Sequence, residues 1–186
     1  MINIKVVSLF LRSFFFFYLL LNHAYAQTFT TESGHAEFKA KASLNSYTGN
    51  SDQLKGRINL KEKTVYFTIP FESIDTGIKK RNKHMMELIE TDKYPNAEFE
   101  GKIISDFNAE KDGSQKVTVK GNFKMHGVSK EITVEGSLTR NGDKLTAEAD
   151  WKVLITDYKI TPPKILGNKV QDEHTIIIKT DLEKRD

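Results

Sequence analysis

Apolar and polar residues alternate along most of the chain after residue 27, which is the period of a strand with one face in a core and the other in water. From Val117 to Met125, every second residue is apolar or glycine, and the residues between them are polar. Other runs have the same period. The sequence therefore predicts eight strands, over residues 36–42, 54–60, 65–71, 97–103, 117–125, 132–138, 145–153 and 176–182.

Short segments with turn-forming residues separate several of these runs. They are Lys111–Ser114, His126-Gly127 and Asn141-Gly142, and each contains a glycine. Connections this short join antiparallel neighbours, because a parallel pair needs a crossover of a dozen residues or more. The expected fold class is all-β, an antiparallel meander of eight strands that forms a sandwich or closes into a barrel.

Two segments depart from this alternation. Residues 78–90 carry apolar side chains spaced three and four apart, which predicts one amphipathic helix. The helix should end before Tyr94-Pro95, because a residue that precedes proline is disfavoured in helical geometry. The second segment, Thr156–Val170, contains two adjacent prolines and is predicted to be a long loop.

Small residues recur on the predicted inner face of the strands. An eight-stranded barrel is just wide enough to be filled by its own side chains or to hold one slender ligand. Small inward residues leave volume, which favours an apolar cavity, whereas glycines can instead mark bends in strongly coiled strands. The positions are Ala36, Ala40, Ala42, Gly56, Gly101, Gly121, Gly136, Ala147 and Ala149.

The first 26 residues have the organisation of a secretory signal peptide. They contain Lys5 and Arg12 but no acid, then the apolar run Phe14–Leu21, and they end in Ala24-Tyr25-Ala26. An uncleaved anchor is the alternative, but a spanning helix needs about 20 apolar residues and Arg12 interrupts this stretch. We expect cleavage after Ala26, a domain over residues 27–186 without a transmembrane segment, and a periplasmic or secreted location.

Composition excludes several classes of function. The formal charge is +3, and Lys5 and Arg12 supply two of these charges, so the predicted domain is nearly neutral and lacks the basic surface that nucleic-acid binding needs. The absence of cysteine excludes disulfides and thiolate chemistry. Phosphate-binding loops, a nucleophile elbow and metal-type histidine spacing are also absent, so we predict no catalytic residue, metal or cofactor.

Two ordered segments resemble signatures of the YceI-like family. The first comprises Phe71–Thr76, Arg81–Met85, Lys93-Tyr94-Pro95 and Phe99, and the second is Val119–Lys130, a strand, a His-Gly turn and the start of the next strand. The similarity extends over essentially the whole predicted domain. Asn82 and Met85 stand where the family usually has Asp and Leu. The resemblance implies an exported, lipocalin-like barrel with a helix at one side, and several such proteins bind an isoprenoid or other amphiphilic lipid.

The leading hypothesis is a non-catalytic carrier that shields the apolar tail of such a lipid. Arg81 and His84 are expected near the mouth, where they meet a polar head group or pin the helix to the rim. The alternatives are a ligand-free interaction or stress-response module with a filled barrel and, less favoured, an enzyme; a homodimer is possible. The residues expected to line the cavity are Phe67, Phe71, Phe99, Gly121, Phe123 and Trp151.

Overall fold

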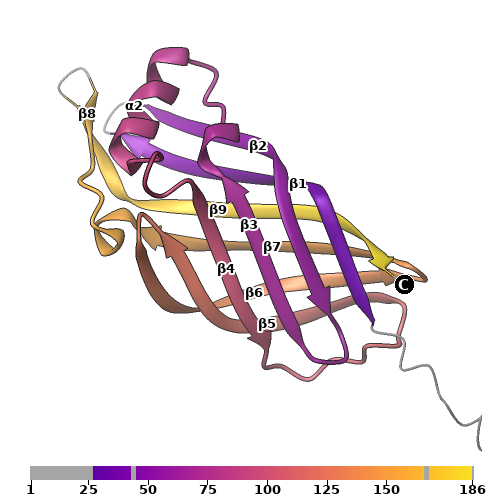
Figure 1. The fold of residues 1–186 in the computed structure, drawn as a ribbon. Coiled ribbons are helices and arrows are strands. Elements are labelled where there is room, and N and C mark those ends of the chain that lie inside the picture. Colours follow the sequence, from indigo (N-terminus) through magenta and orange to yellow (C-terminus); the bar gives the residue numbers. More distant parts are fainter. Residues whose placement is uncertain (1–26, 43–44, 166–167, 186) are drawn as a thin grey trace, which may run out of the picture.

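The protein forms a closed antiparallel β-barrel with one α-helix in the part of the chain that the structure describes (Figure 1). This computed structural model describes residues 27–42, 45–165 and 168–185, so the predicted signal peptide lies outside the described residues. The barrel strands are β1 (Thr28–Ala42), β2 (Ser46–Asn59), β3 (Thr64–Pro70), β4 (Asn96–Ile103), β5 (Gly113–Met125), β6 (Val128–Asn141), β7 (Lys144–Leu154) and β9 (Asn168–Arg185).

Each strand pairs with the next in the chain, and β9 closes the barrel by pairing with both β7 and β1. The predicted fold class and the eight strands are confirmed. Several strands are longer than predicted, and the largest extensions are at the starts of β1, β2 and β9, which begin at Thr28, Ser46 and Asn168. These extensions carry few large apolar residues, and backbone pairing with neighbouring strands holds them in the sheet.

The predicted tight turns differ in their outcome. His126 and Gly127 have φ angles of 49° and 72° and connect Met125 directly to Val128, which is the positive-φ geometry of a two-residue type I′ hairpin. Gly142, with φ 60°, lies between β6 and β7. The predicted Lys111–Ser114 turn is instead the end of a longer connection, residues 104–112, and Gly113 and Ser114 already belong to β5.

The predicted helix is α2 (Lys79–Ile89), and it ends at Glu90, which adopts a left-handed conformation before Pro95. Two short 3-10 helices, η1 (Phe71–Ser73) and η2 (Ile155–Tyr158), follow β3 and β7. The prediction of one long loop over residues 156–170 is wrong. That segment contains most of η2, the two-residue strand β8 (Lys164–Ile165) and the start of β9, with which β8 pairs.

Three of the most deeply buried side chains lie together at one end of the barrel. Phe29, Leu145 and Leu182 are at most 1% exposed, and they come from the start of β1, the start of β7 and the end of β9. These strand ends meet at the end of the barrel farther from α2 (Figure 1). Helix α2 joins β3 to β4 at the other end.

Candidate functional site

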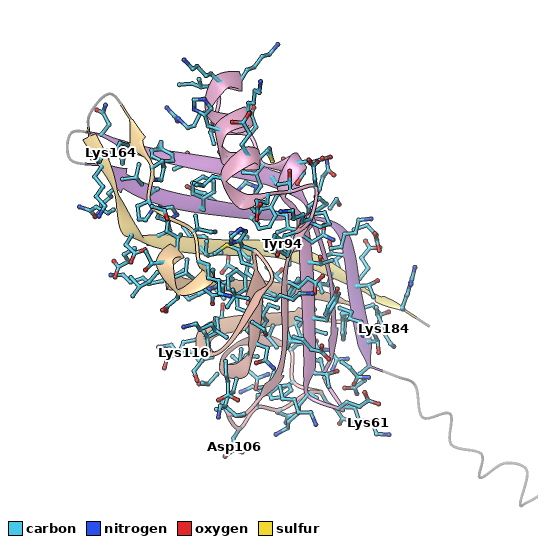
Figure 2. All side chains as sticks on the ribbon, turned by 60° about the vertical axis from the view of Figure 1, so that its left-hand side comes forward. Lys61, Tyr94, Asp106, Lys116, Lys164 and Lys184 are labelled. Carbon is cyan, nitrogen blue, oxygen red and sulfur yellow. The ribbon has the colours of Figure 1, made fainter. Side chains whose placement is uncertain are left out.

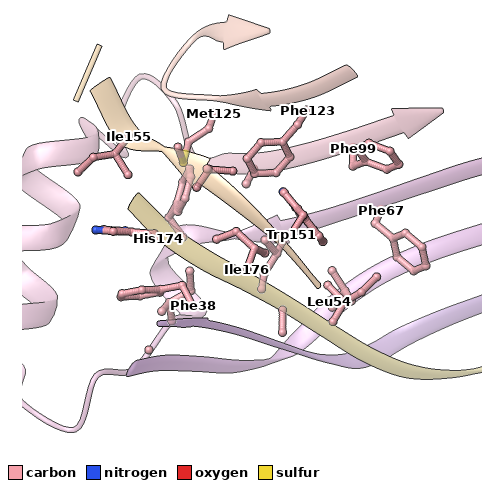
Figure 3. A pocket seen from close by; sticks show the side chains of 18 of the residues that line it. Phe38, Leu54, Phe67, Phe99, Phe123, Met125, Trp151, Ile155, His174 and Ile176 are labelled. Atoms are coloured by element: carbon pink, nitrogen blue, oxygen red, sulfur yellow. The ribbon is translucent and has the colours of Figure 1, made fainter. Parts of the chain in front are cut away.

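A cavity of about 960 Å³ lies inside the barrel and extends to the end nearer α2 (Figure 3). All eight long strands contribute inward side chains to its wall, as their alternating burial requires. The cavity opens beside α2, because three residues that line it are also exposed to solvent: Ile78, Lys80 and His84. We call this opening, bounded by those three residues and Arg81, the mouth.

Aromatic side chains form much of the inner wall. Phe67 pairs with Phe99, and Phe99 pairs with Phe123, which places three rings in one row across β3, β4 and β5. The Trp151 ring packs against this row, with its centroid 5.7 Å from that of Phe123 and 6.4 Å from that of Phe99. Phe71, in η1, also lines the cavity. Their contact with a ligand remains a prediction.

Gly121 requires a correction, because it does not line the cavity. It stands opposite Gly101 in the β4–β5 pair. A Cβ atom at Gly121 would lie 2.3 Å from the Glu100 carbonyl oxygen and 2.5 Å from the Gly101 Cα atom. The glycine pair therefore lets two backbones approach closely, which is the bend that sequence reasoning considered as the alternative.

The other small inward residues either line the cavity or allow neighbouring groups to pack closely. Ala36, Gly136, Ala147 and Ala149 line the cavity and leave room in it. Gly56 instead accommodates the Phe67 ring, whose Cδ1 atom would lie only 2.1 Å from a Cβ at that position. The inward small residues thus reflect both an open cavity and close packing.

A row of aromatic rings that the sequence did not predict crosses the barrel wall near the mouth. The Arg81 guanidinium lies 4.7 Å from the centroid of the Tyr47 ring, and Tyr47 contacts Phe38 edge-on with centroids 6.1 Å apart. Phe38 in turn stacks on His174 at 6.0 Å. Tyr47 and His174 lie outside the strand ranges expected from alternation. Of this row, only Phe38 could be predicted to point inward from the sequence.

Arg81 and His84 both lie at the mouth, where they were predicted, but they differ in their contacts. Arg81 is half-buried and also donates a hydrogen bond to the Thr76 carbonyl, 3.4 Å away. His84 is exposed on the helix. Arg81 therefore attaches α2 to the barrel wall, whereas His84 remains accessible at the opening.

The rings near the mouth are neutral at ordinary pH. Burial raises the pKa of the Tyr47 phenol, and the nearby Arg81 charge opposes this only in part. Burial likewise lowers the pKa of His174, against the opposing effects of the Gln171 backbone and Asp172. Burial and Asp157 raise the pKa of Tyr158 to about 12. A mainly apolar interior whose tyrosine and histidine rings are uncharged suits a hydrocarbon chain.

The position of α2 over the barrel end is set by two polar networks. At its start, Asn82 accepts a hydrogen bond from the Thr76 backbone N–H and donates one to Asp75, at 2.9 and 2.7 Å. Beyond its end, His126 Nδ1 donates to the Tyr158 carbonyl at 2.8 Å, and Nε2 lies 3.3 Å from Glu90. The two family-like segments therefore meet where the helix is attached.

Within the described residues, no group of three or more His, Asp or Glu side chains is arranged to hold a metal ion. Over the same residues, none of the helices is long and apolar enough to cross a bilayer.

Comparison with known proteins agrees with this architecture. A family model for the YceI-like domain matches residues 27–182. Protein YceI of Salmonella arizonae is 31% identical over 121 residues, which span 61% of this chain and 59% of that protein. The chain thus matches about three fifths of the length of this relative.

Solved structures are similar in fold at low identity. A polyisoprenoid-binding domain from Saccharophagus degradans implicated in plant cell wall breakdown has a TM-score of 0.73 at 18% identity, over 86% of this chain and 99% of that one. BcnA of Burkholderia cenocepacia has a TM-score of 0.67 at 18% identity, over 80% and 95% of the two chains. From the match to the domain model, which covers nearly the whole barrel, this chain belongs to the YceI-like family.

Proposed function

We propose that this protein is an exported, non-catalytic carrier that holds an isoprenoid or other amphiphilic lipid in the barrel cavity. The observation that supports it most directly is the cavity of about 960 Å³, which is lined mainly by apolar side chains and opens at one end. This volume lies at the upper end of the range of about 300–1,000 Å³ for small-molecule sites. A barrel filled throughout by its own side chains, as the alternative hypothesis requires, would leave no such volume.

The energetics favour a ligand with a long apolar tail. Each buried methylene group contributes about 0.8 kcal/mol, so a tail of several isoprenoid units can be held without a charged partner. The similar domain from Saccharophagus degradans is a polyisoprenoid-binding domain, which supports the same class of ligand. Export is supported by the sequence pattern of residues 1–26.

The direct test is to purify the protein from its native compartment, extract it with organic solvent and search for a stoichiometric lipid by mass spectrometry. The sole tryptophan, Trp151, lines the cavity and provides a second measurement. Its fluorescence should change in a saturable manner when the purified barrel is titrated with a prenyl alcohol such as geranylgeraniol. An empty extract together with an unresponsive Trp151 would exclude the carrier function.

A cavity-filling substitution tests where the ligand binds. Ala149 lines the cavity, so Ala149→Leu should project extra volume into it and weaken prenyl alcohol binding by about tenfold, the loss expected when overpacking costs 1–3 kcal/mol. Thr133→Leu is the matched control, because Thr133 is exposed on β6 and does not line the cavity. Equal affinities for both variants and the wild type would place the ligand elsewhere.

A further inference from the structure

The outer face of α2 carries a concentration of positive charge beside the mouth. The helix contains Lys79, Lys80, Arg81 and Lys83 but one acid, Glu87. Lys79 and Lys83 lie one turn apart on one stripe of the helix, and Lys80 and His84 lie on the next. All four are exposed, and Figure 2 shows long side chains of this helix that project away from the barrel.

These charges are poorly compensated within the protein. Among the described residues, no acid pairs with Lys79 or Lys80, and Lys83 reaches Glu87 only at 3.9 Å. On the barrel wall, by contrast, Lys120, Lys152 and Lys179 each lie within 3 Å of a carboxylate oxygen on a neighbouring strand. The basic face of α2 therefore remains available to an external anionic partner.

The position of these charges on the helix is itself unfavourable. The first turn of α2 contains no acid, and its N-cap, Ile78, makes no side-chain capping hydrogen bond. The amino end of a helix carries partial positive charge, so cations there oppose the helix dipole. An anionic surface placed against this turn would compensate the lysine charges and the partial positive charge of the helix end.

An apolar side chain accompanies the charges. Ile78 is 49% exposed, directly precedes the three basic residues of the first turn, and lines the mouth. A basic helix face with an exposed apolar residue at its edge is suited to the interface of a bilayer that contains anionic lipids, where lysines meet head groups and the apolar side chain enters the acyl boundary.

We propose that the basic face of α2, formed by Lys79, Lys80, Lys83 and His84 with Ile78, docks the mouth onto the surface of an anionic membrane. This inference rests on the proposed carrier function. A lipid tail that crosses water exposes its methylene groups, and each exposed group is unfavourable. A mouth held against the bilayer lets the tail pass from one apolar environment to the other.

Vesicle co-sedimentation tests the docking surface. The barrel domain, residues 27–186, should bind vesicles that contain phosphatidylglycerol, should not bind vesicles of phosphatidylcholine alone, and should lose affinity as salt increases. The double substitution Lys79→Gln/Lys83→Gln should weaken this binding by about tenfold or more, since each lysine near an anionic surface contributes about 1 kcal/mol. Neither residue lines the cavity.

The matched control is Lys61→Gln/Lys116→Gln, which removes the same charge from exposed positions remote from α2 (Figure 2). This control should bind phosphatidylglycerol vesicles like the wild type. Equal losses for the two double variants would show a general charge effect and overturn the docking surface. Absent vesicle binding would overturn it too, and capture of an acidic protein in that case would identify a protein interface instead.

Lipid binding without vesicles separates this inference from the proposed function. The Lys79→Gln/Lys83→Gln variant should retain the wild-type response of Trp151 to geranylgeraniol added from solution, but should take up the same alcohol from phosphatidylglycerol vesicles about tenfold more slowly. Uptake from vesicles at the wild-type rate would contradict membrane docking and leave the carrier function standing. Loss of the Trp151 response in the wild type itself would remove the carrier function.

Discussion

At the scale of single residues, burial of His174 links the stability of the barrel to pH. Its ring stacks on Phe38, and burial lowers its pKa despite the opposing effects of the Gln171 backbone and Asp172. In the unfolded chain the histidine pKa is about 6.5. Between the two pKa values the unfolded chain binds more protons, so the free energy of unfolding should decrease as the pH falls below about 6.5.

Denaturant unfolding between pH 7.5 and 5 measures this effect. His174→Phe keeps an aromatic ring against Phe38 and removes the titratable group, so its stability should decrease less over this range than that of the wild type. His84→Phe, on the exposed face of α2, is the control and should follow the wild type. If His174→Phe loses as much stability in acid as the wild type, other groups account for the pH dependence.

The sequence predicted the role of an inward residue only where that role does not depend on the residues of the adjacent strand. Phe67, Phe99 and Phe123 follow from alternation alone, because large apolar residues on an inner face must lie in the barrel. Gly121 has the same register, yet it contacts the Gly101 backbone instead of the cavity. That difference depends on how closely two strands approach each other. The pattern of residues along one strand does not reveal this distance.

At the scale of elements, the attachment of α2 depends on the amide of Asn82. Its oxygen accepts from Thr76, and its Nδ2 donates to Asp75. Asn82→Asp keeps the acceptor but places a second carboxylate against Asp75, so it should lower the unfolding temperature at neutral pH. The difference from the wild type should shrink near pH 4, where carboxylates become protonated.

An exchange of the two side chains provides the control. In Asp75→Asn/Asn82→Asp, the amide and the carboxylate trade places, and a hydrogen bond between them can form again. The double variant should therefore regain most of the unfolding temperature that Asn82→Asp loses. If it is no more stable than Asn82→Asp, the contact between residues 75 and 82 does not hold the helix.

Helices, strands and turns could be predicted where the local sequence alone determines their conformation. The spacing of Met85, Leu88 and Ile89 locates α2, and the His126-Gly127 dipeptide locates a hairpin turn. The start of β2, from Ser46 to Gln53, could not be predicted, because pairing with β1 holds this mainly polar stretch in the sheet. Strand β8 likewise exists through its pairing with β9, in a segment whose prolines indicated a loop.

At the scale of the whole molecule, the barrel combines a filled end and a hollow end. Phe29, Leu145 and Leu182 fill the end remote from α2 and do not line the cavity, whereas Ala36, Ala147 and Ala149 line it and leave room in it. The sequence left a filled barrel and an open barrel as alternatives, because alternation is the same in both. The outcome depends on the side chains that all eight long strands bring together around the cavity, and alternation along a single strand does not describe that combination.

This division predicts that stability and lipid binding can be changed separately. Leu182→Ala should cost about 2–5 kcal/mol of unfolding free energy, because it leaves a void in a fully buried position, yet it should preserve affinity for geranylgeraniol under conditions where the protein is folded. Leu154→Ala is the matched control: Leu154 is 45% exposed, so the same substitution should cost only about 0.5 kcal/mol.

Ala149→Leu should show the opposite behaviour, with weaker binding and little loss of stability, because the larger side chain enters the open cavity. Denaturant unfolding and Trp151 titration of the three variants measure both quantities on the same samples. A Leu182→Ala protein that is folded but no longer binds lipid would contradict the division, since it would mean that the filled end also shapes the cavity. Separate responses would instead establish that one end holds the barrel together while the other is free to accommodate its ligand.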